Sequence, residues 1–351
     1  MATTFHRRDL QKLIDSAKSA GYRFIAPVRD GDITRFREVT NANDIVLNEI
    51  LPTKSVKEFF LAEHELILKY KFGEGGNVEL EPVDAPDFAK PAIIFGCRPC
   101  DAAAAPIIRG VMTWDYDDNF FLERMKSNVV AAIACVEADE ACFCTSVNVQ
   151  PDGSEGADIL LKPTQPGTGV EQEYAVEAVT DKGKDFISKT QGWGSGDAKP
   201  TLDIQELKGK LKPRFDAAKI HDWLVANFYD PFWKTASLQC IGCGTCTYLC
   251  PTCHCFDIVD EGDIHFGRRV KNWDSCQMKN FTLHTSGHNP RDIQWERYRQ
   301  RIMHKFRYYP DKFGRILCTG CGRCQRSCPV DMAMVSIIER IRDQAAAPVA
   351  K

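Results

Sequence analysis

A motif of four cysteines and a proline occurs twice in this 351-residue chain, and it constrains the fold more than any other feature of the sequence. The motif is Cys-x2-Cys-x2-Cys-x3-Cys-Pro, and its two copies span residues 240–251 and 318–329. Three thiolates in such a short loop can bind three irons of a cubane, while the fourth cysteine reaches the neighbouring cluster. The repeat therefore predicts two adjacent [4Fe-4S] clusters with crossed ligands.

The crossed arrangement predicts one ligand set for each cluster. The first set is Cys240, Cys243, Cys246 and Cys328, and the second set is Cys318, Cys321, Cys324 and Cys250. Glycines stand beside the ligands in both motifs, and we expect them to let backbone amides approach the sulfurs. Structural zinc is the alternative, because it also uses Cys-x2-Cys pairs. Zinc is disfavoured, since it needs neither the third cysteine of each loop nor the proline.

Five further cysteines lie ahead of the repeat, in the segments FGCRPCDAA and ACVEADEACFCTS. Each segment contains the end of an expected buried strand, and the carboxyl ends of such strands gather at one edge of an α/β sheet. We therefore predict a third [4Fe-4S] cluster on Cys100, Cys135, Cys142 and Cys144, with Cys97 packed in the core. Ordinary buried cysteines and a zinc site are the alternatives.

Three cysteines near the first motif have no place in these sets: Cys253, Cys255 and Cys276. They could shield the adjacent cluster, replace a ligand or pack as small apolar residues. We predict that they pack. We expect His221, His254 and His288 likewise to pack or to form hydrogen bonds rather than to bind metal.

The 67 residues between Cys250 and Cys318, 251–317, are expected to be largely helical. Asn289 and Pro290 read as the N-cap and first residue of a helix that runs to about Tyr309. Its inner face would carry Trp295, Tyr298, Ile302, Phe306 and Tyr309. A helix at about 215–229 precedes the first motif, and another follows the second motif and buries Met334, Ile337, Ile338 and Ile341. This pattern predicts an α-helical ferredoxin-type dicluster domain at residues 211–351.

The helix expected between the motifs is locally basic, although the whole chain has a formal net charge of -3. A solvated helix face would explain this, and so would cations that offset cluster charge or that dock an acidic partner. These three interpretations stay open for Arg297, Arg299, Arg301, His304, Lys305 and Arg307.

The chain is too long for a ferredoxin alone and is expected to form two domains. Residues 8–20 have helical spacing of apolar side chains and end at Gly21, a typical C-cap. The runs 91–97 and 128–135 are short and apolar without polar alternation, as in strands buried on both faces. With a loop-like boundary at 190–200, these features predict an α+β or α/β domain at residues 1–210.

Composition and motifs exclude several functional classes. The sixteen cysteines are clustered rather than scattered as in a disulfide framework, the N-terminus lacks a signal peptide, and the most apolar segment, 128–138, is too short to span a membrane. We therefore expect a soluble cytoplasmic protein that binds neither nucleic acid nor membrane. Because no G-x-G-x-x-G or Walker A motif is present, we expect electrons to come from and go to other proteins.

Segments along nearly the whole chain resemble the iron–sulfur beta subunit of cytosolic sulfhydrogenases and the related A subunit of anaerobic sulfite reductase. The segments are GYRFIAPVRDG, LPTKSVKEFF, IFGCRPCDAAA, ACFCTS, CPTCHCFDI, NWDSCQ, SGHNPR and RQRIMHKFRYY. The resemblance implies a relay between a flavin subunit, linked to NAD(P)H or ferredoxin, and a catalytic subunit such as a NiFe hydrogenase or sulfite reductase. The family would have an apolar residue at Cys97, which leaves Cys97 and Cys100 as alternative ligands.

Other functions remain as alternatives. The bridging module is similar to that of flavin-dependent transhydrogenase and heterodisulfide-reductase complexes. A zinc-stabilised scaffold without redox function is a second alternative, and an enzyme that reduces a small molecule at its own N-terminal cysteine site is a third. An intermolecular electron-transfer subunit is the leading prediction.

Overall fold

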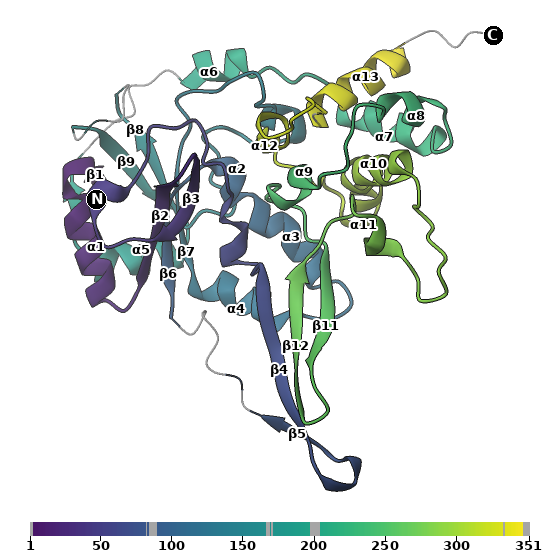
Figure 1. Ribbon diagram of the computed structural model, residues 1–351. Coiled ribbons are helices and arrows are strands. Elements are labelled where there is room, and N and C mark those ends of the chain that lie inside the picture. The colour runs from purple at the N-terminus through teal and green to yellow at the C-terminus, as the bar shows by residue number, and fades with distance from the viewer. Residues whose placement is uncertain are drawn as a thin grey trace.

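The computed structural model describes residues 3–81, 83, 90–165, 169, 171–196, 204–332 and 334–346. Its N-terminal part is built on an eight-stranded mixed sheet with the strand order β10-β1-β9-β8-β7-β6-β2-β3 (Figure 1). The strands are β1 (Thr3–His6), β2 (Arg23–Asp30), β3 (Ile33–Glu38), β6 (Ala92–Cys97), β7 (Val129–Ile133), β8 (Ile159–Pro163), β9 (Glu173–Ala178) and β10 (Trp193–Ser195).

Four neighbouring strands at the centre of this sheet, β2, β6, β7 and β8, are parallel. Every residue of β6 and β7 is buried, which confirms the two strands predicted without polar alternation. Their side chains alternate between two cores, so that Phe95 packs in one and Ile94 in the other. The carboxyl ends of β6 and β7 consequently lie at one edge of the sheet.

Helices cover both faces of the sheet (Figure 1). Leu13 and Phe186 pack into one core, from α1 (Leu10–Ser19) and α5 (Asp181–Lys189). Ile108 and Phe121 pack into the other, from α3 (Ala104–Met112) and α4 (Asn119–Ser127) beside the short α2 (Pro99–Ala102). The predicted first helix and its glycine C-cap are confirmed, since Gly21 has φ +88°. The N-terminal part is thus a three-layer α/β structure.

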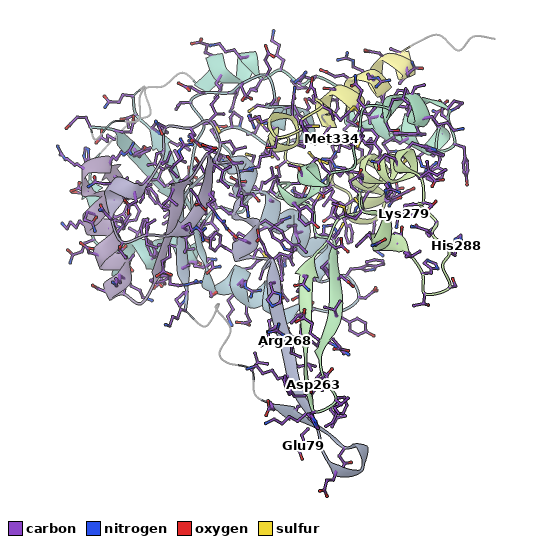
Figure 2. All side chains as sticks on the ribbon, in the orientation of Figure 1. Glu79, Asp263, Arg268, Lys279, His288 and Met334 are labelled. Atoms are coloured by element: carbon purple, nitrogen blue, oxygen red, sulfur yellow. The ribbon has the colours of Figure 1, made fainter. Side chains whose placement is uncertain are left out.

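A second sheet, of order β11-β12-β4-β5, projects from the body as a long arm (Figure 1). It joins segments far apart in the chain: β4 (His64–Phe72), β5 (Val78–Glu81), β11 (Phe256–Gly262) and β12 (Phe266–Trp273). Figure 2 shows Glu79, Asp263 and Arg268 on the projecting part of this arm. The expectation of a largely helical segment between the motifs was wrong here, because FDIVDEGDIHFGRRVKNW forms a hairpin.

The C-terminal part is mainly helical and surrounds a separate core that contains Trp233, Ile302, Phe306 and Ile338. Its helices are α7 (Ala217–Ala226), α8 (Phe232–Ala236), α9 (Thr245–Tyr248), α10 (Gln294–Met303), α11 (Tyr309–Phe313), α12 (Arg323–Arg326) and α13 (Met334–Ala346), with α6 (Ile204–Lys210) preceding them. The predicted α/β part followed by a helical part is confirmed. Short 3-10 turns occur at Arg7–Asp9, Ala42–Asp44, Val56–Phe59, Glu74–Gly76, Cys144–Val147 and Lys279–Thr282.

The long basic helix begins later than predicted. It starts at Gln294 and continues from α10 through a π-helical turn, His304–Tyr308, into α11. Asn289 is not its N-cap: the side-chain oxygen accepts hydrogen bonds from Arg291 N–H at 3.0 Å and from the Thr282 hydroxyl at 2.8 Å, which closes a turn instead. The side chains predicted for the inner face of this helix do face the core. Trp295 is partly buried and packs against it, and the other four are buried: Tyr298, Ile302, Phe306 and Tyr309.

The division at residue 210 stays a prediction. Residues 197–200 of the expected boundary lie outside the described residues. The helical core also takes in Phe143 and Val147 from the N-terminal part, so the two parts pack tightly against each other. Among the described residues, no helix is long and apolar enough to cross a membrane.

Candidate functional site: three groups of cysteines

The first group lies at the carboxyl edge of the parallel strands. Cys100 comes from α2 directly after β6, Cys135 follows β7, and the next loop carries Cys142 and Cys144. These four side chains line one cavity. Cys97 is fully buried, with its sulfur 4.0 Å from the backbone oxygen of Ala131. The structure therefore brings together the four predicted cysteines and leaves Cys97 in the core, as an edge site requires.

The second motif packs directly on this group. Cys321 lines the same cavity, and Phe143 N–H donates to the backbone oxygen of Gly320 at 2.9 Å. A Cβ at Gly320 would lie 2.5 Å from the Cys144 Cα, and one at Gly322 would lie 2.4 Å from the Ala141 oxygen. Both glycines also have positive φ, which other residues rarely adopt. They are required because the motif loop touches the backbone of the N-terminal cysteine segment.

A buried ion pair joins the same two segments. Arg323, beside Cys324, donates to both carboxylate oxygens of Asp101, which follows Cys100, at 2.6 and 2.8 Å. Arg323 also donates to the Pro52 oxygen at 3.0 Å. The bidentate geometry fixes the orientation of α12 against α2, because a guanidinium fork matches a carboxylate in one plane.

The first motif faces the second. Its short helix α9 packs against α12, and Gly242 and Gly244 have the same positive φ as Gly320 and Gly322. Cys250 lies close enough to Cys318 and Cys321 for its charge to influence their pKa values, as the crossed-ligand rule requires. Cys246 lies close enough to Cys324 for the charge of Cys324 to influence the pKa of Cys246. The structure thus brings the two motifs together.

Several hydrogen-bond donors point at cysteine sulfurs. Gly320 N–H donates to Cys318 at 3.4 Å, Gln294 donates to Cys240 at 3.2 Å, and Met332 N–H donates to Cys328 at 3.1 Å. On the N-terminal group, Arg326 donates to Cys142 at 3.1 Å. Cys243 is the exposed member of the sixteen cysteines. Donors to sulfur stabilise the charged ligands of a cluster.

Two cations of the basic helix are buried among the sulfurs. Lys305 is 2% exposed, and its Nζ lies 3.3 Å from the Cys250 sulfur and 2.8 Å from the Leu317 oxygen. Burial opposes the charges of Lys305 and Arg301, but the neighbouring sulfurs outweigh it and raise the pKa of both groups. The interpretation as a solvated helix face is therefore wrong for Lys305 and Arg301. The interpretation as cations that offset the negative charge of the sulfurs fits both residues.

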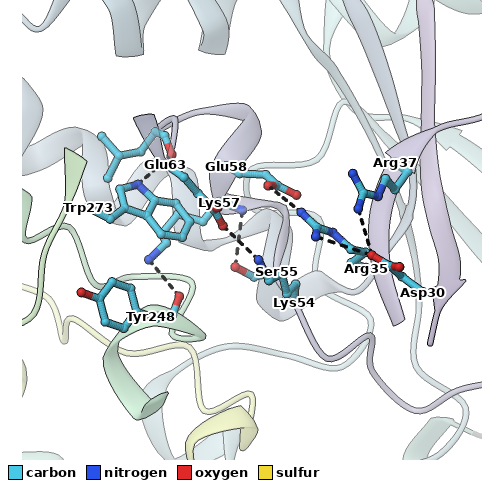
Figure 3. Close-up of polar contacts among 11 residues, drawn as sticks. Asp30, Arg35, Arg37, Lys54, Ser55, Lys57, Glu58, Glu63, Tyr248 and Trp273 are labelled. Carbon is cyan, nitrogen blue, oxygen red and sulfur yellow. Dashed lines mark hydrogen bonds and ion pairs between the residues drawn. The ribbon is translucent and has the colours of Figure 1, made fainter. Parts of the chain in front are cut away.

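Sequence reasoning missed a third cation, Lys57, which comes from the N-terminal part. Its Nζ donates to the backbone oxygens of Tyr248 at 3.3 Å and Cys253 at 3.0 Å, and it lies 3.7 Å from the centre of the Trp273 ring. Figure 3 shows Lys57, Tyr248 and Trp273 meeting from three segments of the chain. No local pattern could have revealed this role, because the partners lie about 200 residues away.

The chemistry of the donors fits iron–sulfur clusters. Burial is the main cause that raises the pKa of Cys135 and Cys321 to about 11, and that of Cys144 and Cys318 to about 12. These thiols would be neutral without metal, whereas a bound metal ion deprotonates a coordinating thiol. Among the described residues, no three His, Cys, Asp or Glu side chains could hold a single metal ion. A cubane instead spreads its cysteines over four irons.

Comparisons with known proteins agree with this geometry. Residues 239–332 match the family model of the 4Fe-4S dicluster domain. The chain is 27% identical over 344 residues to sulfhydrogenase 2 subunit beta of Pyrococcus furiosus, an alignment that covers 96% of this chain and 97% of the relative. The chain is a homologue of the sulfhydrogenase beta subunit. No solved structure matches it.

The similarity between this chain and the relative extends well beyond the dicluster domain. The alignment also covers the α/β part that carries the N-terminal cysteines, which confirms the family resemblance inferred from segments along the chain. The two findings together identify an iron–sulfur electron-transfer protein.

Proposed function

We propose that the chain is a relay subunit of a multisubunit oxidoreductase, carrying electrons between a flavin subunit and a catalytic subunit. The observation that supports this most is the contiguity of the three cysteine groups. The second motif loop contacts the N-terminal group through Gly320, and it faces the first motif through α9 and α12. Three adjacent redox sites would form a continuous path through the protein.

In this proposal, each motif supplies three ligands to its own cluster and one to the other, as predicted. The proximity of Cys250 to Cys318 supports Cys250 as the fourth ligand of the cluster on the second motif. The motif rule assigns Cys328 as the fourth ligand of the cluster on the first motif. The N-terminal cluster would use Cys100, Cys135, Cys142 and Cys144. Bound clusters would supply one-electron transfer, while the chain supplies thiols, sulfur donors and buried cations.

The proposed partners follow from the relative, which is named as one subunit of a sulfhydrogenase. We propose a flavin subunit that reacts with NAD(P)H or ferredoxin, and a catalytic subunit such as a NiFe hydrogenase or a sulfite reductase, in the cytoplasm. A relay subunit of a flavin-based transhydrogenase or heterodisulfide-reductase complex is the second candidate, because the same contiguous cysteine groups suit it. Anaerobic purification of the native complex, followed by flavin, nickel and siroheme analysis, distinguishes them.

Iron content tests the number of clusters. Anaerobically prepared protein should contain about 12 irons per chain with three cubanes and about 8 with two. The double variant Cys142→Ser, Cys144→Ser should lose about 4 irons, and the buried-core variant Cys97→Ser should lose none. A double variant that keeps its full iron content would refute the third cluster.

Spectroscopy separates the relay from a zinc scaffold and from an independent enzyme. The reduced chain should show the EPR signals of interacting [4Fe-4S] clusters. Iron-free protein that contains zinc would favour the scaffold. Turnover of a small molecule by the isolated chain with an artificial electron donor would favour an enzyme over a relay.

A further inference from the structure

The loop of the first cysteine motif is open to solvent. Within the loop, the apolar side chain of Ile241 is 64% exposed, and Leu238, two residues ahead of Cys240, is 79% exposed. Cys243 is exposed as well, although the motif rule makes it a cluster ligand. One end of the proposed relay therefore reaches the protein surface at this loop.

The corresponding loop of the second motif is covered. Thr319 stands where the first motif has Ile241, and it is only 1% exposed. Cys321 stands where the first motif has Cys243, and it is also buried. The N-terminal cysteine segment packs on this loop, and its backbone donates a hydrogen bond to the Gly320 oxygen at 2.9 Å. The internal repeat thus shows what covers such a loop, namely a segment that carries another group of cysteines.

The glycines of the first motif contact side chains of the C-terminal part instead. A Cβ at Gly242 would lie 2.9 Å from the Gln294 Oε1, and one at Gly244 would lie 2.5 Å from the Met278 Cε. Ile293, which precedes Gln294 in the chain, is itself exposed. These contacts support the loop from within the C-terminal part, and its apolar side chains still face solvent.

The sequence around the open loop is uncharged. Residues 235–256 contain no Asp, Glu, Lys or Arg. Charged residues are depleted in the core of stable protein interfaces, whereas encounters that form and dissociate quickly are steered by complementary charge. An exposed apolar surface that adjoins a cluster ligand therefore fits a stably bound protein rather than a mobile charged carrier.

We propose that the open-loop patch, which consists of Leu238, Ile241, Cys243 and Ile293, is the docking surface for a permanently bound redox subunit. That subunit presents an uncharged, apolar contact surface with its redox centre close behind it, as the N-terminal cysteine segment does for the second motif. The inference rests on the proposed relay function, and it specifies the end of the relay at which this partner binds.

Charged substitutions in the patch test the docking surface in the native complex, purified anaerobically through a tag on this chain. We expect Leu238→Asp and Ile241→Asp each to reduce the retained partner subunit by about tenfold or more, because the new carboxylate would be buried without a counter-charge. Iron content and the EPR signals of the chain should match the wild type. The control is Tyr116→Asp, at an exposed aromatic residue of the N-terminal part, and it should retain the partner fully.

A photo-crosslinking amino acid at position 238 identifies the occupant. We expect a crosslink to a subunit that contains flavin, iron, nickel or siroheme, in a complex that persists in about 1 M salt, where charge attraction is screened. Crosslinking to a second copy of this chain, dissociation of the partner by salt, or full retention of the partner in both patch variants would overturn the docking surface and leave the relay standing. An iron-free wild-type chain would instead refute the relay itself.

Discussion

Arg323 and Asp101 form a bidentate ion pair across 222 residues of sequence, and both side chains are almost completely buried, at 2% and 0% exposure. Each belongs to a segment that carries predicted cluster ligands. Their contact therefore connects the edge of the α/β sheet to the second cysteine motif, and it sets the position of one cysteine group against the other.

Breaking this ion pair should destabilise the protein strongly. We expect Asp101→Asn to lower the free energy of unfolding by about 3–5 kcal/mol, because it leaves the Arg323 charge buried and uncompensated. Denaturant titration of anaerobic protein measures the change. The exposed pair Arg269 and Asp260 on the arm is the control, and Asp260→Asn should leave the free energy of unfolding nearly unchanged, because solvent screens an exposed ion pair. Equal effects of the two substitutions would contradict the structural role of Arg323.

Gly320→Ala should separate the N-terminal cysteine group from the second motif. The new Cβ would lie 2.5 Å from the Cys144 backbone, which cannot move without displacing that group. Gly314→Ala is a matched control, because Gly314 also has positive φ but has open space around it. We expect about 1–2 kcal/mol of destabilisation at Gly314 from φ alone, and about 1–3 kcal/mol more at Gly320 from the clash. Equal unfolding midpoints for the two variants would argue against the close contact.

Lys305→Met should make one cluster harder to reduce. The Lys305 ammonium lies 3.3 Å from the Cys250 sulfur, and reduction adds negative charge that this cation stabilises. We expect the reduction potential of that cluster to fall by on the order of 60 mV, or about 1.4 kcal/mol for one electron. An EPR-monitored redox titration measures it, with the exposed Lys279→Met as the control. Unchanged potentials in a variant with full iron content would show that Lys305 does not act on the cluster.

The contact between His221 and Asp311 should depend on pH. The hydrogen bond to Asp311, at 2.6 Å, is the largest influence that raises the pKa of His221 above its ordinary value of 6.5. The stabilisation is thus complete below pH 6.5 and is lost as the pH rises through the raised pKa of the folded state. An NMR titration of the His221 ring should show this pKa, and Asp311→Asn should lower it. Asp222→Asn, which removes a weaker contact at 3.4 Å, should lower it less.

Local sequence patterns predicted elements whose cause is itself local. The all-apolar runs of β6 and β7 identified the central strands, because both of their faces are covered by helices. The helical spacing before Gly21 identified α1 for the same reason. The hairpin of β11 and β12 was missed, although Gly262 and Asp263 at its turn are residues typical of a hairpin connection.

The cysteine spacing alone determined the kind of cofactor, because a three-cysteine loop of that length and a following proline suit a cubane and little else. The sequence also named the segments that carry the cysteines. Only the tertiary structure decided which groups meet, through the contacts of Gly320 with Cys144 and of Arg323 with Asp101. It also decided that Lys57 and Lys305 lie beside the cysteines. Such pairings depend on how the sheet, arm and helices pack, and packing across hundreds of residues leaves no local pattern in the chain.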